Sequence, residues 1–394
     1  MEIVSTAWHV LIAFIVFLTG ALIMSILAKR FHVSFLRSLV LYSWHSVFCL
    51  FYLWFTLRFG GDAIAYFMKA SNGRVEWDFG TAGVDYFTAL LVRGFDVSLL
   101  GTFLIFNIFG ALGLLAIDGS LKAATRDAKP YVVKLATLIV FLPSLSFWSS
   151  AIGKDSLSFM ATGLALWAAL DLGRRGLLIG GAIVVMLMVR PHVAGIMVMG
   201  LALAIIFDSN VSTIKRLVYG LCAVGVASIL VPFALQYAGV GDTVSVGDLN
   251  EYIDKRQTSN MEGGGAVDIS SMSLPVQLFT YMFRPTFLEV NSIFSIAAAL
   301  DNAILLYLFV VGGWALFKSR VRTFGNRVFM WAYVLIAWII LAMVTANLGI
   351  ALRQKWMFAP MLIFLLISVI GKKKPNDVPD GSAFNQVSQP PVKL

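Results

Sequence analysis

Long apolar runs recur along the whole chain, and they limit most strongly what it can fold into. Each run holds about 15 to 25 residues, the length of helix needed to cross roughly 30 Å of hydrocarbon. Hydrophobic residues make up 59% of the 394 residues and charged residues only 13%, about half the share in a soluble domain. The sequence therefore predicts an all-α polytopic membrane protein with a single transmembrane domain over residues 1–371.

Eleven such runs are delimited by polar connections. They cover residues 7–28, 38–57, 98–117, 132–150, 156–172, 177–189, 193–207, 217–237, 292–317, 328–346 and 356–371. We expect each run to form one transmembrane helix, about eleven in all.

The distribution of positive charge predicts the orientation. If the N terminus is outside, 19 of the 30 lysines and arginines fall in inner connections, as the positive-inside rule requires. The sequence thus predicts an N-out, C-in topology with two long extracytoplasmic loops, 58–97 and 238–291. Residues 372–394, rich in Pro, Ser, Gln and Asn, are expected to form a disordered cytoplasmic tail. The net charge of +9 follows from the same bias, and we expect no nucleic-acid partner.

Asp62 and Tyr66 follow the second apolar run, at the start of the first long loop. The preceding Gly60-Gly61 is typical of a turn, and Asp62 completes ordinary turn chemistry. Under the predicted orientation Asp62 also lies just outside the membrane, at the mouth of a helix. Two interpretations stand side by side: a turn residue, or a catalytic carboxylate supported by Tyr66.

Lys154 and Asp155 begin the fifth run. Asp155 is favourable at the positive end of a helix. Lys154 is unfavourable there unless an anion docks on the free backbone N–H groups. The pair indicates either an ordinary helix start or an anion-binding site.

Arg190-Pro191-His192 forms the turn between the sixth and seventh runs. The sixth run has only about 13 residues, roughly 20 Å of helix, so Arg190 and His192 are expected below the outer membrane surface. A buried cation at that depth must face protein or water and find an anion. The alternative is a short hairpin whose arginine reaches the lipid headgroups.

Further cations precede the last helices. Arg284 and Glu289 lie before the ninth run, where an interfacial anchor is the alternative to a site role. Arg353 and Lys355 lie in a short outer connection, against the positive-inside trend. That position favours a local function for them.

Together these residues predict a cavity that opens to the outer side. Its cations are Lys154, Arg190, His192, Arg284 and Arg353, and its acids are Asp62, Asp155 and Glu289. Arginine presents a planar fork of donors that suits phosphate. Such a cavity at a membrane surface favours a lipid whose head is a phosphate or pyrophosphate.

Metal and nucleotide motifs are weak. Asp248, Glu251 and Asp254 could hold a divalent cation, although a solvated helix face explains them more simply. The chain has neither a Walker loop nor a dinucleotide-binding glycine turn. We expect no required cofactor and no protein metal site, with a divalent cation as an optional addition. Asp301, inside the ninth run, is either a functional intramembrane acid or a polar contact between helices.

Five short motifs resemble those of a known class of membrane enzymes. They are segment 58–66 with Asp62 and Tyr66, stretch 143–155, Arg190-Pro191-His192, Phe283-Arg284-Pro285 and Asn347-x-Gly-x-x-x-Arg353. The set resembles the Wzy-like or EpsG-like exopolysaccharide and O-antigen polymerases and the wider class of GT-C glycosyltransferases. The resemblance implies an acidic base in the first outer loop, matched by Asp62, and donor-binding arginines, matched by Arg190, Arg284 and Arg353. The extra run before the acidic loop and the outer N terminus depart from the common GT-C pattern.

The resulting hypothesis is a glycosyltransferase on the outer face of a bacterial cytoplasmic membrane, active in surface polysaccharide assembly. It would transfer sugar from a polyprenyl-phosphate or polyprenyl-pyrophosphate donor to a saccharide or lipid-linked glycan acceptor. Asp62 would be the general base. The donor phosphate would be bound by Lys154, Arg190, Arg284 and Arg353, with Tyr66, Asp155, His192, Glu289 and Lys355 in support.

The other expected partners are membrane lipids and other polysaccharide assembly proteins.

Two other classes of function stay open. A transporter or flippase of lipid-linked saccharides needs the same anion-binding cavity but no base, so Asp301 would matter more than Asp62. A non-enzymatic component of a polysaccharide export complex would use the cations only to meet lipid headgroups.

Overall fold

The computed structural model describes residues 2–207, 265–318 and 324–371, with isolated residues between 214 and 258. The α-helices are α1 (Ala7–Ala28), α2 (Phe35–Phe59), α3 (Asp62–Asn72), α4 (Thr81–Ala89), α5 (Leu99–Ala124), α6 (Pro130–Val140), α7 (Pro143–Ser149), α8 (Lys154–Ala169), α9 (Leu172–Val189), α10 (Pro191–Ile206), α13 (Leu274–Phe283), α14 (Ile293–Lys318), α15 (Arg327–Val344), α16 (Leu348–Gln354) and α17 (Ala359–Ile367). Shorter helical turns are η1 (Lys29–Phe31), η2 (Leu90–Gly94), η3 (Phe287–Glu289) and η4 (Lys355–Met357). The predicted all-α class is confirmed for these residues.

Seven helices in the described part are long and apolar enough to cross a membrane. They cover Ala7–Phe31, Phe35–Phe59, Leu99–Ala124, Pro130–Ser149, Leu172–Val189, Ile293–Lys318 and Arg327–Val344. The stretch Leu348–Met357 and helix α17, bent by 62° at their junction, make an eighth if they are one broken span. The chain is therefore a membrane protein.

The predicted count of eleven spans is not confirmed. Ten of the eleven runs coincide with described helices, and most of run 217–237 lies outside the described residues. Helices α8 and α10 have 16 residues each, roughly 24 Å, which is less than the hydrocarbon thickness of about 30 Å. The two predicted long loops also contain helices. Segment 58–97 folds into α3, α4 and η2. The described part of segment 238–291 contains α13 and η3. Tail 372–394 lies outside the described residues.

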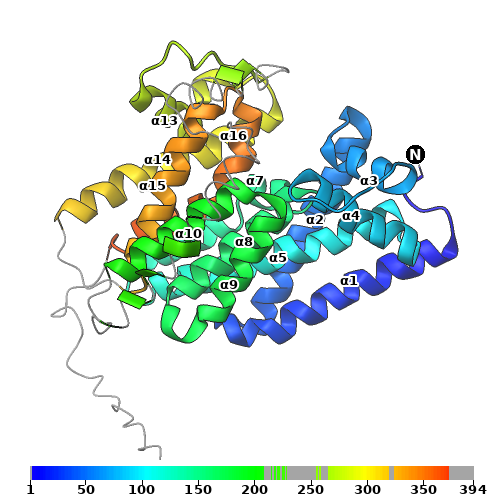
Figure 1. Cartoon of the computed structure of the whole chain (residues 1–394), viewed down its shortest axis with the longest axis horizontal. Coiled ribbons are helices and arrows are strands. Elements are labelled where there is room, and N and C mark those ends of the chain that lie inside the picture. Colours follow the sequence, from blue (N-terminus) through cyan, green and yellow to red (C-terminus); the bar gives the residue numbers. More distant parts are fainter. Residues whose placement is uncertain are drawn as a thin grey trace, which may run out of the picture.

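Helix α5 forms the centre of the bundle. It lies between α1 and α8 (Figure 1), and most of its side chains are buried. Small residues let the helices approach closely, as is common inside membranes. A Cβ on Gly113 would lie 2.8 Å from the Cα of Met160, and one on Gly163 would lie 2.5 Å from the carbonyl oxygen of Gly113. Glycine is therefore required where α5 meets α8.

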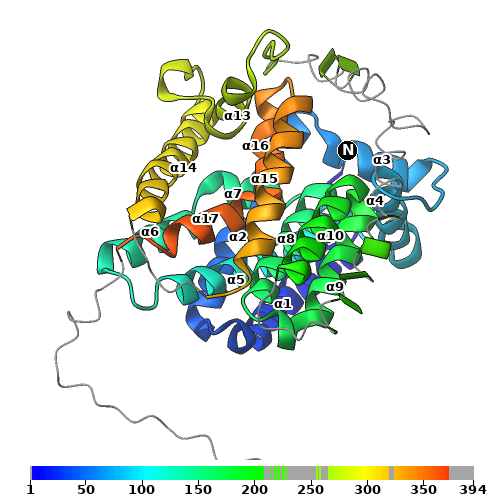
Figure 2. The same ribbon diagram turned by 60° about the vertical axis from the view of Figure 1, so that its left-hand side comes forward.

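A second layer packs against this centre. Figure 2 shows α17 between α14 and α15, which agrees with the contacts of these helices. Side chains from α14, α15 and α17 share one apolar core with those of α5 and α8. The C-terminal helices are thus fixed relative to the N-terminal ones.

A buried polar network attaches α7 to α2 and α5. His45 Nδ1 lies 2.6 Å from Asn107 Oδ1, and His45 Nε2 lies 2.9 Å from Ser149 Oγ. Asn107 Nδ2 also donates to Ser46 Oγ at 2.9 Å. Hydrogen bonds between helices rigidify a membrane bundle, so the end of α7 is held in place.

The connections gather at two opposite ends of the bundle. At one end Arg37 makes a bidentate ion pair with Asp118, and Lys129 N–H donates to the carbonyl of Gly371. At the other end the N terminus lies beside α3 and α4 (Figure 1), and His9 approaches Asp96 at 3.5 Å. The first end carries the basic connections that the charge distribution predicts to be cytoplasmic. The orientation in the membrane stays a prediction.

Candidate functional site

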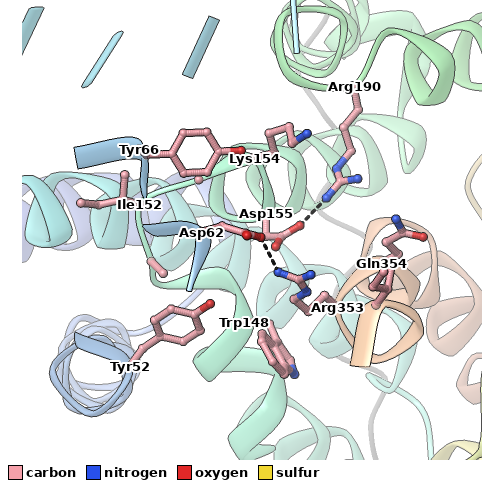
Figure 3. A pocket seen from close by; sticks show the side chains of 13 residues that line it. Tyr52, Asp62, Tyr66, Trp148, Ile152, Lys154, Asp155, Arg190, Arg353 and Gln354 are labelled. Atoms are coloured by element: carbon pink, nitrogen blue, oxygen red, sulfur yellow. Dashed lines mark hydrogen bonds and ion pairs between the residues drawn. The ribbon is translucent and has the colours of Figure 1, made fainter. Parts of the chain in front are cut away.

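A cavity of about 170 Å³ lies at the end of the bundle that carries α3 and α16. We call it the cationic pocket. It is lined by Tyr52, Asp62, Tyr66, Trp148, Ala151, Ile152, Gly153, Lys154, Asp155, Arg190, Ile350, Arg353 and Gln354 (Figure 3). Pockets that hold whole small molecules measure roughly 300–1,000 Å³. The cationic pocket is thus smaller than a site that encloses a whole small molecule.

The turn between α2 and α3 places Asp62 and Tyr66. Helix α2 ends at Phe59, and Gly60 and Gly61 have φ values of +79° and +156°, which favour glycine over residues with a side chain. Asp62 is the first residue of α3, and Tyr66 lies one turn later. Positions i and i+4 share a helix face, so both side chains reach the same pocket.

The start of α8 supplies the next two residues. Lys154 Nζ donates to Thr81 Oγ1 at 2.9 Å, which connects α8 to α4. Helix α8 has no side-chain cap at its N-terminus. Asp155 takes part of that role electrostatically, because a carboxylate is stabilised near the positive end of a helix.

Arg190 lies at the corner between α9 and α10. Pro191 begins α10 and keeps Arg190 out of the helix. Its side chain is only 10% exposed, and Arg190 Nη2 lies 2.5 Å from Asp155 Oδ1. Arg190 Nε has no hydrogen-bond partner among the described residues. The arginine therefore has one buried N–H group without a partner in the described part of the chain, in addition to the one paired with Asp155.

Arg353 reaches the pocket from the opposite side. Asn347 caps α16 by accepting from the N–H groups of Gly349 and Ile350. At the other end of this helix, Arg353 Nη1 donates to Asp62 Oδ2 at 2.9 Å. Its guanidinium also lies 5.6 Å from the ring centroid of Trp148, close enough for a cation–π contact. Figure 3 shows both ion pairs side by side.

The charges of the cationic pocket do not cancel. Three cations, Lys154, Arg190 and Arg353, face two carboxylates, Asp62 and Asp155. The excess is one positive charge, which suits an anion. Each carboxylate already holds an arginine, so an incoming anion competes with a protein acid for its partner.

Tyr66 adds a neutral donor. Burial raises the pKa of its phenol, and the nearby charges of Asp155 and Asp62 raise this pKa further. The phenol stays protonated at neutral pH and can donate a hydrogen bond to an oxygen in the pocket.

Arg284 and Glu289 are not brought into this pocket, contrary to the prediction of a shared site. Arg284 Nε donates to Glu289 Oε1 at 2.7 Å, and Glu289 also accepts from Thr286. These hydrogen bonds, that from Arg284 most of all, lower the pKa of Glu289. Because Glu289, five residues away, already pairs with Arg284, this arginine is not a candidate for binding an anion at the cationic pocket.

Lys355 and His192 do not line the pocket either. Lys355 is fully buried and donates to Asn302 Oδ1 beside Asp301. His192 is half-buried on the first turn of α10. The structure therefore does not place either residue on the wall of the pocket, where the sequence predicted a supporting role.

Three of the polar or aromatic lining residues were not among the predicted site residues. Tyr52 lies on α2, Trp148 on α7 and Gln354 on α16. Trp148 lies in the stretch 143–155 and Gln354 follows Arg353, so both belong to or adjoin motifs that the sequence analysis singled out. Tyr52 lies inside an apolar run, where nothing in the sequence separates it from the other buried aromatic residues.

The described residues contain no cluster of three or more His, Cys, Asp or Glu side chains that could hold a metal ion. Asp248 and Glu251, which the sequence suggested as optional ligands with Asp254, lie outside the described residues. Within the cationic pocket, arginines occupy both carboxylates.

The chain was compared with protein-family models, with curated proteins and with solved structures, and none of them matches it.

Proposed function

We propose that this chain is a membrane glycosyltransferase of the polysaccharide-polymerase kind, with the cationic pocket as its site for the donor phosphate. One observation carries the proposal: Lys154, Arg190 and Arg353 surround a single cavity together with the carboxylate of Asp62. The donor would be a polyprenyl-phosphate or polyprenyl-pyrophosphate sugar, and the acceptor a saccharide or lipid-linked glycan. The reaction would take place on the outer face of a bacterial cytoplasmic membrane.

The proposed reaction is a single displacement at the anomeric carbon of the sugar. The acceptor oxygen forms a bond to this carbon while the bond from the carbon to the phosphate oxygen breaks. The electron pair leaves with the polyprenyl phosphate or pyrophosphate, and the proton of the acceptor passes to Asp62. Lys154, Arg190 and Arg353 stabilise the charge that grows on the leaving phosphate.

The pairing of Arg353 with Asp62 adds one step to this scheme. A phosphate oxygen replaces the Asp62 carboxylate on Arg353, because a multiply charged anion binds a guanidinium more strongly than one carboxylate does. The displaced carboxylate is then free to meet the acceptor hydroxyl. Gly60 and Gly61, just before Asp62, allow this movement without moving α2.

The decisive experiment measures glycan formation by the purified protein from a synthetic polyprenyl-linked donor. Asp62→Asn keeps the size of the side chain but cannot accept the proton, so transfer should slow by roughly 10² to 10⁴. Glu76→Gln is the matched control, because Glu76 is an exposed acid of segment 58–97 outside the pocket. Formation of no glycosidic bond by the wild-type protein, with donors that it demonstrably binds, would refute the transferase proposal.

A transporter or flippase of lipid-linked saccharides is the second candidate. The buried pair of Asp301 on α14 and Lys355 on η4 favours it, because charged residues inside a membrane often mark a transport pathway. Flipping of a fluorescent polyprenyl-linked saccharide in liposomes, measured beside the transfer assay, separates the two.

A further inference from the structure

A second cavity, of about 560 Å³, adjoins the cationic pocket. It lies between α2, α7, α14 and α16, and most of its wall is aromatic or aliphatic. Its lining includes Phe48, Phe51, Phe55, Phe147, Trp148, Phe294, Ala297, Leu348 and Leu352. We call this cavity the aromatic groove. Its volume is within the range of pockets that hold organic ligands.

The two cavities share a wall. The ring of Trp148 lines both of them. Helix α16 separates them, since Leu348 and Leu352 line the groove and Ile350 and Arg353 line the pocket. Positions 348 and 352 are one helical turn apart and share a face. An elongated ligand can therefore place a charged end against Arg353 and an apolar end against the opposite face of α16.

The groove follows the axis of α2 into the bundle. Phe55, Phe51 and Phe48 lie on successive turns, so the lining extends for roughly 10 Å along this helix. Ser292, just before α14, and Phe294, Ser295, Ala297 and Ala298 on α14 line the other side. The polar lining residues Glu289, Asn291 and Ser292 precede the body of α14, and Asn347 caps α16, so the polar end of the groove lies at these helix starts. This arrangement matches a ligand that descends from the membrane surface towards its interior.

The groove also has a side open to the surroundings of the protein. Phe294 of α14 reaches α2, where its ring centroid is 6.3 Å from that of Phe51 and 5.1 Å from that of Phe55. Phe51 and Phe294 are each 39% exposed. Because α2 and α14 are membrane-spanning helices, their exposed side chains face lipid. The rings of Phe51 and Phe294 pack against each other, so a hydrocarbon chain can approach the groove along their lipid-exposed edges rather than between them.

We propose that the aromatic groove binds the hydrocarbon tail of the donor, in the section next to its phosphate. This inference rests on the proposed function and names the part of the substrate that the cationic pocket cannot hold. A resident membrane lipid is the competing occupant. The donor's own tail is favoured because the groove begins at the wall of a cavity built for its charged head.

Tail binding cannot come from the hydrophobic effect alone, because lipid is already as apolar as the groove. Its benefit is orientation: a tail held along α2 fixes where the phosphate lies against Arg353. The groove should therefore distinguish lipids that carry a phosphate from lipids that do not, as well as long tails from short ones.

The test uses a polyprenyl phosphate that carries a photoreactive group in its tail, bound to the full-length protein in lipid nanodiscs. Illumination should label residues of the groove on α2 and α14. The substitution Ala297→Trp fills the groove and should reduce this labelling roughly tenfold, the scale on which hydrophobic pockets discriminate. Ile296→Trp is the matched control, because Ile296 lies on the same helix, is 51% exposed and does not line the groove.

Several outcomes overturn the proposal. Labelling that is unchanged by Ala297→Trp would do so. So would labelling of α1 and other lipid-facing helices to the same extent as the groove. Equal labelling by a polyprenol without phosphate would assign the groove to general membrane lipid instead.

The same experiments distinguish failure of the proposed transferase function from failure of the proposed tail binding in the groove. Groove labelling that excess inorganic pyrophosphate abolishes, in a protein that forms no glycosidic bond, would support the groove and refute the transferase. Sugar transfer with equal efficiency from long-tailed and short-tailed donors, in wild type and in Ala297→Trp, would keep the transferase and refute the groove.

Discussion

Arg353 and Asp62 are 291 residues apart in the sequence, and Arg353 Nη1 donates a 2.9 Å hydrogen bond to Asp62 Oδ2. The two partners differ in their surroundings. The side chain of Arg353 is 25% exposed and packs over Trp148, whereas that of Asp62 is 69% exposed. The arginine is therefore the fixed member of the pair and the carboxylate the movable one.

This asymmetry makes a prediction about anion binding. Asp62→Asn should bind inorganic pyrophosphate up to about fivefold more tightly than wild type, because an exposed ion pair contributes roughly 0.2–1 kcal/mol and no longer competes for Arg353. The measurement is isothermal titration calorimetry in detergent. Glu76→Gln should bind as wild type does. Weaker binding by Asp62→Asn would show that Asp62 does not compete with the anion.

Arg190 should contribute both to anion binding and to stability. Arg190→Ala removes the ion-pair partner of Asp155; the pair is 10% and 23% exposed, so the loss should cost less than the value of about 3–5 kcal/mol for a fully buried pair. Arg190→Ala should therefore weaken pyrophosphate binding and lower the unfolding temperature. The double substitution Arg190→Ala/Asp155→Asn should recover much of the stability but not the binding.

Arg74→Ala serves as the control for loss of an arginine, because Arg74 is exposed and does not line the pocket. Its unfolding temperature and its affinity for pyrophosphate should match those of wild type. Equal affinity of Arg190→Ala and Arg74→Ala would remove Arg190 from the anion site.

The pair of Arg284 and Glu289 predicts a pH dependence. The pKa of Glu289 is lowered in the folded protein, first by the hydrogen bond from Arg284. A lowered folded pKa means that the pair stabilises the fold above the unfolded value, about 4.3. This contribution is lost as the pH falls through the folded pKa.

Glu289→Gln should therefore lose less stability than wild type when the pH is lowered from 7 to 3. The difference should be at most about 1 kcal/mol, because the pair is partly exposed. Thermal unfolding in detergent at both pH values measures it, and Glu76→Gln should behave as wild type. An identical pH response of Glu289→Gln and wild type would mean that the pair does not stabilise the fold.

Part of the site could be predicted because helix ends are easy to locate in a membrane sequence. Charged residues that flank alternate apolar runs must lie at the same end of the bundle. This argument brought together Asp62, Lys154, Asp155, Arg190 and Arg353, all of which line one pocket. The sequence determines the end of the bundle at which these residues lie, but not the direction in which each side chain points.

The same argument was wrong for residues whose side-chain direction decides whether they reach the pocket. Arg284 lies at the expected end, but Glu289 is close enough in the chain to bind it first. Lys355 follows Arg353 by two residues, which rotates it about the helix axis into the core. For α8 and α10, apolar length does not decide whether the helix crosses the membrane, since 16 residues are slightly shorter than a usual span and a run can also be apolar because it is buried in protein.

The orientation can be tested with described, exposed positions at the two ends. A cysteine at Glu76 should react with a membrane-impermeant maleimide in intact cells, because segment 58–97 is predicted to be outside. A cysteine at Arg126 should react only after the membrane is opened. Labelling is compared with that of the parent protein, whose cysteines are Cys49 and Cys222. The reverse pattern would place the cationic pocket in the cytoplasm.

The last prediction concerns the buried pair of Asp301 and Lys355, and it separates the two candidate functions. Both residues are fully buried, and the oxygens of Asp301 accept no hydrogen bond from the described residues. Lys355 lies at the bend between α16 and α17 and donates to Asn302. Asp301 on α14 therefore interacts with the bend through the nearby charge of Lys355, while the hydrogen bond to Asn302 attaches Lys355 to α14.

Asp301→Asn alone leaves Lys355 as an uncompensated buried charge and should destabilise the protein by about 3–5 kcal/mol. The double substitution Asp301→Asn/Lys355→Met removes both charges, so most of this stability should return. Unfolding in detergent measures the difference.

Once its fold is established, the double variant tests whether function requires the two charges. A transferase should still form glycan at close to the wild-type rate, because neither residue lines the cationic pocket. A transporter that moves its substrate past this pair should lose flipping in liposomes. Loss of sugar transfer by a stable double variant would mean that the charges act on the reaction itself.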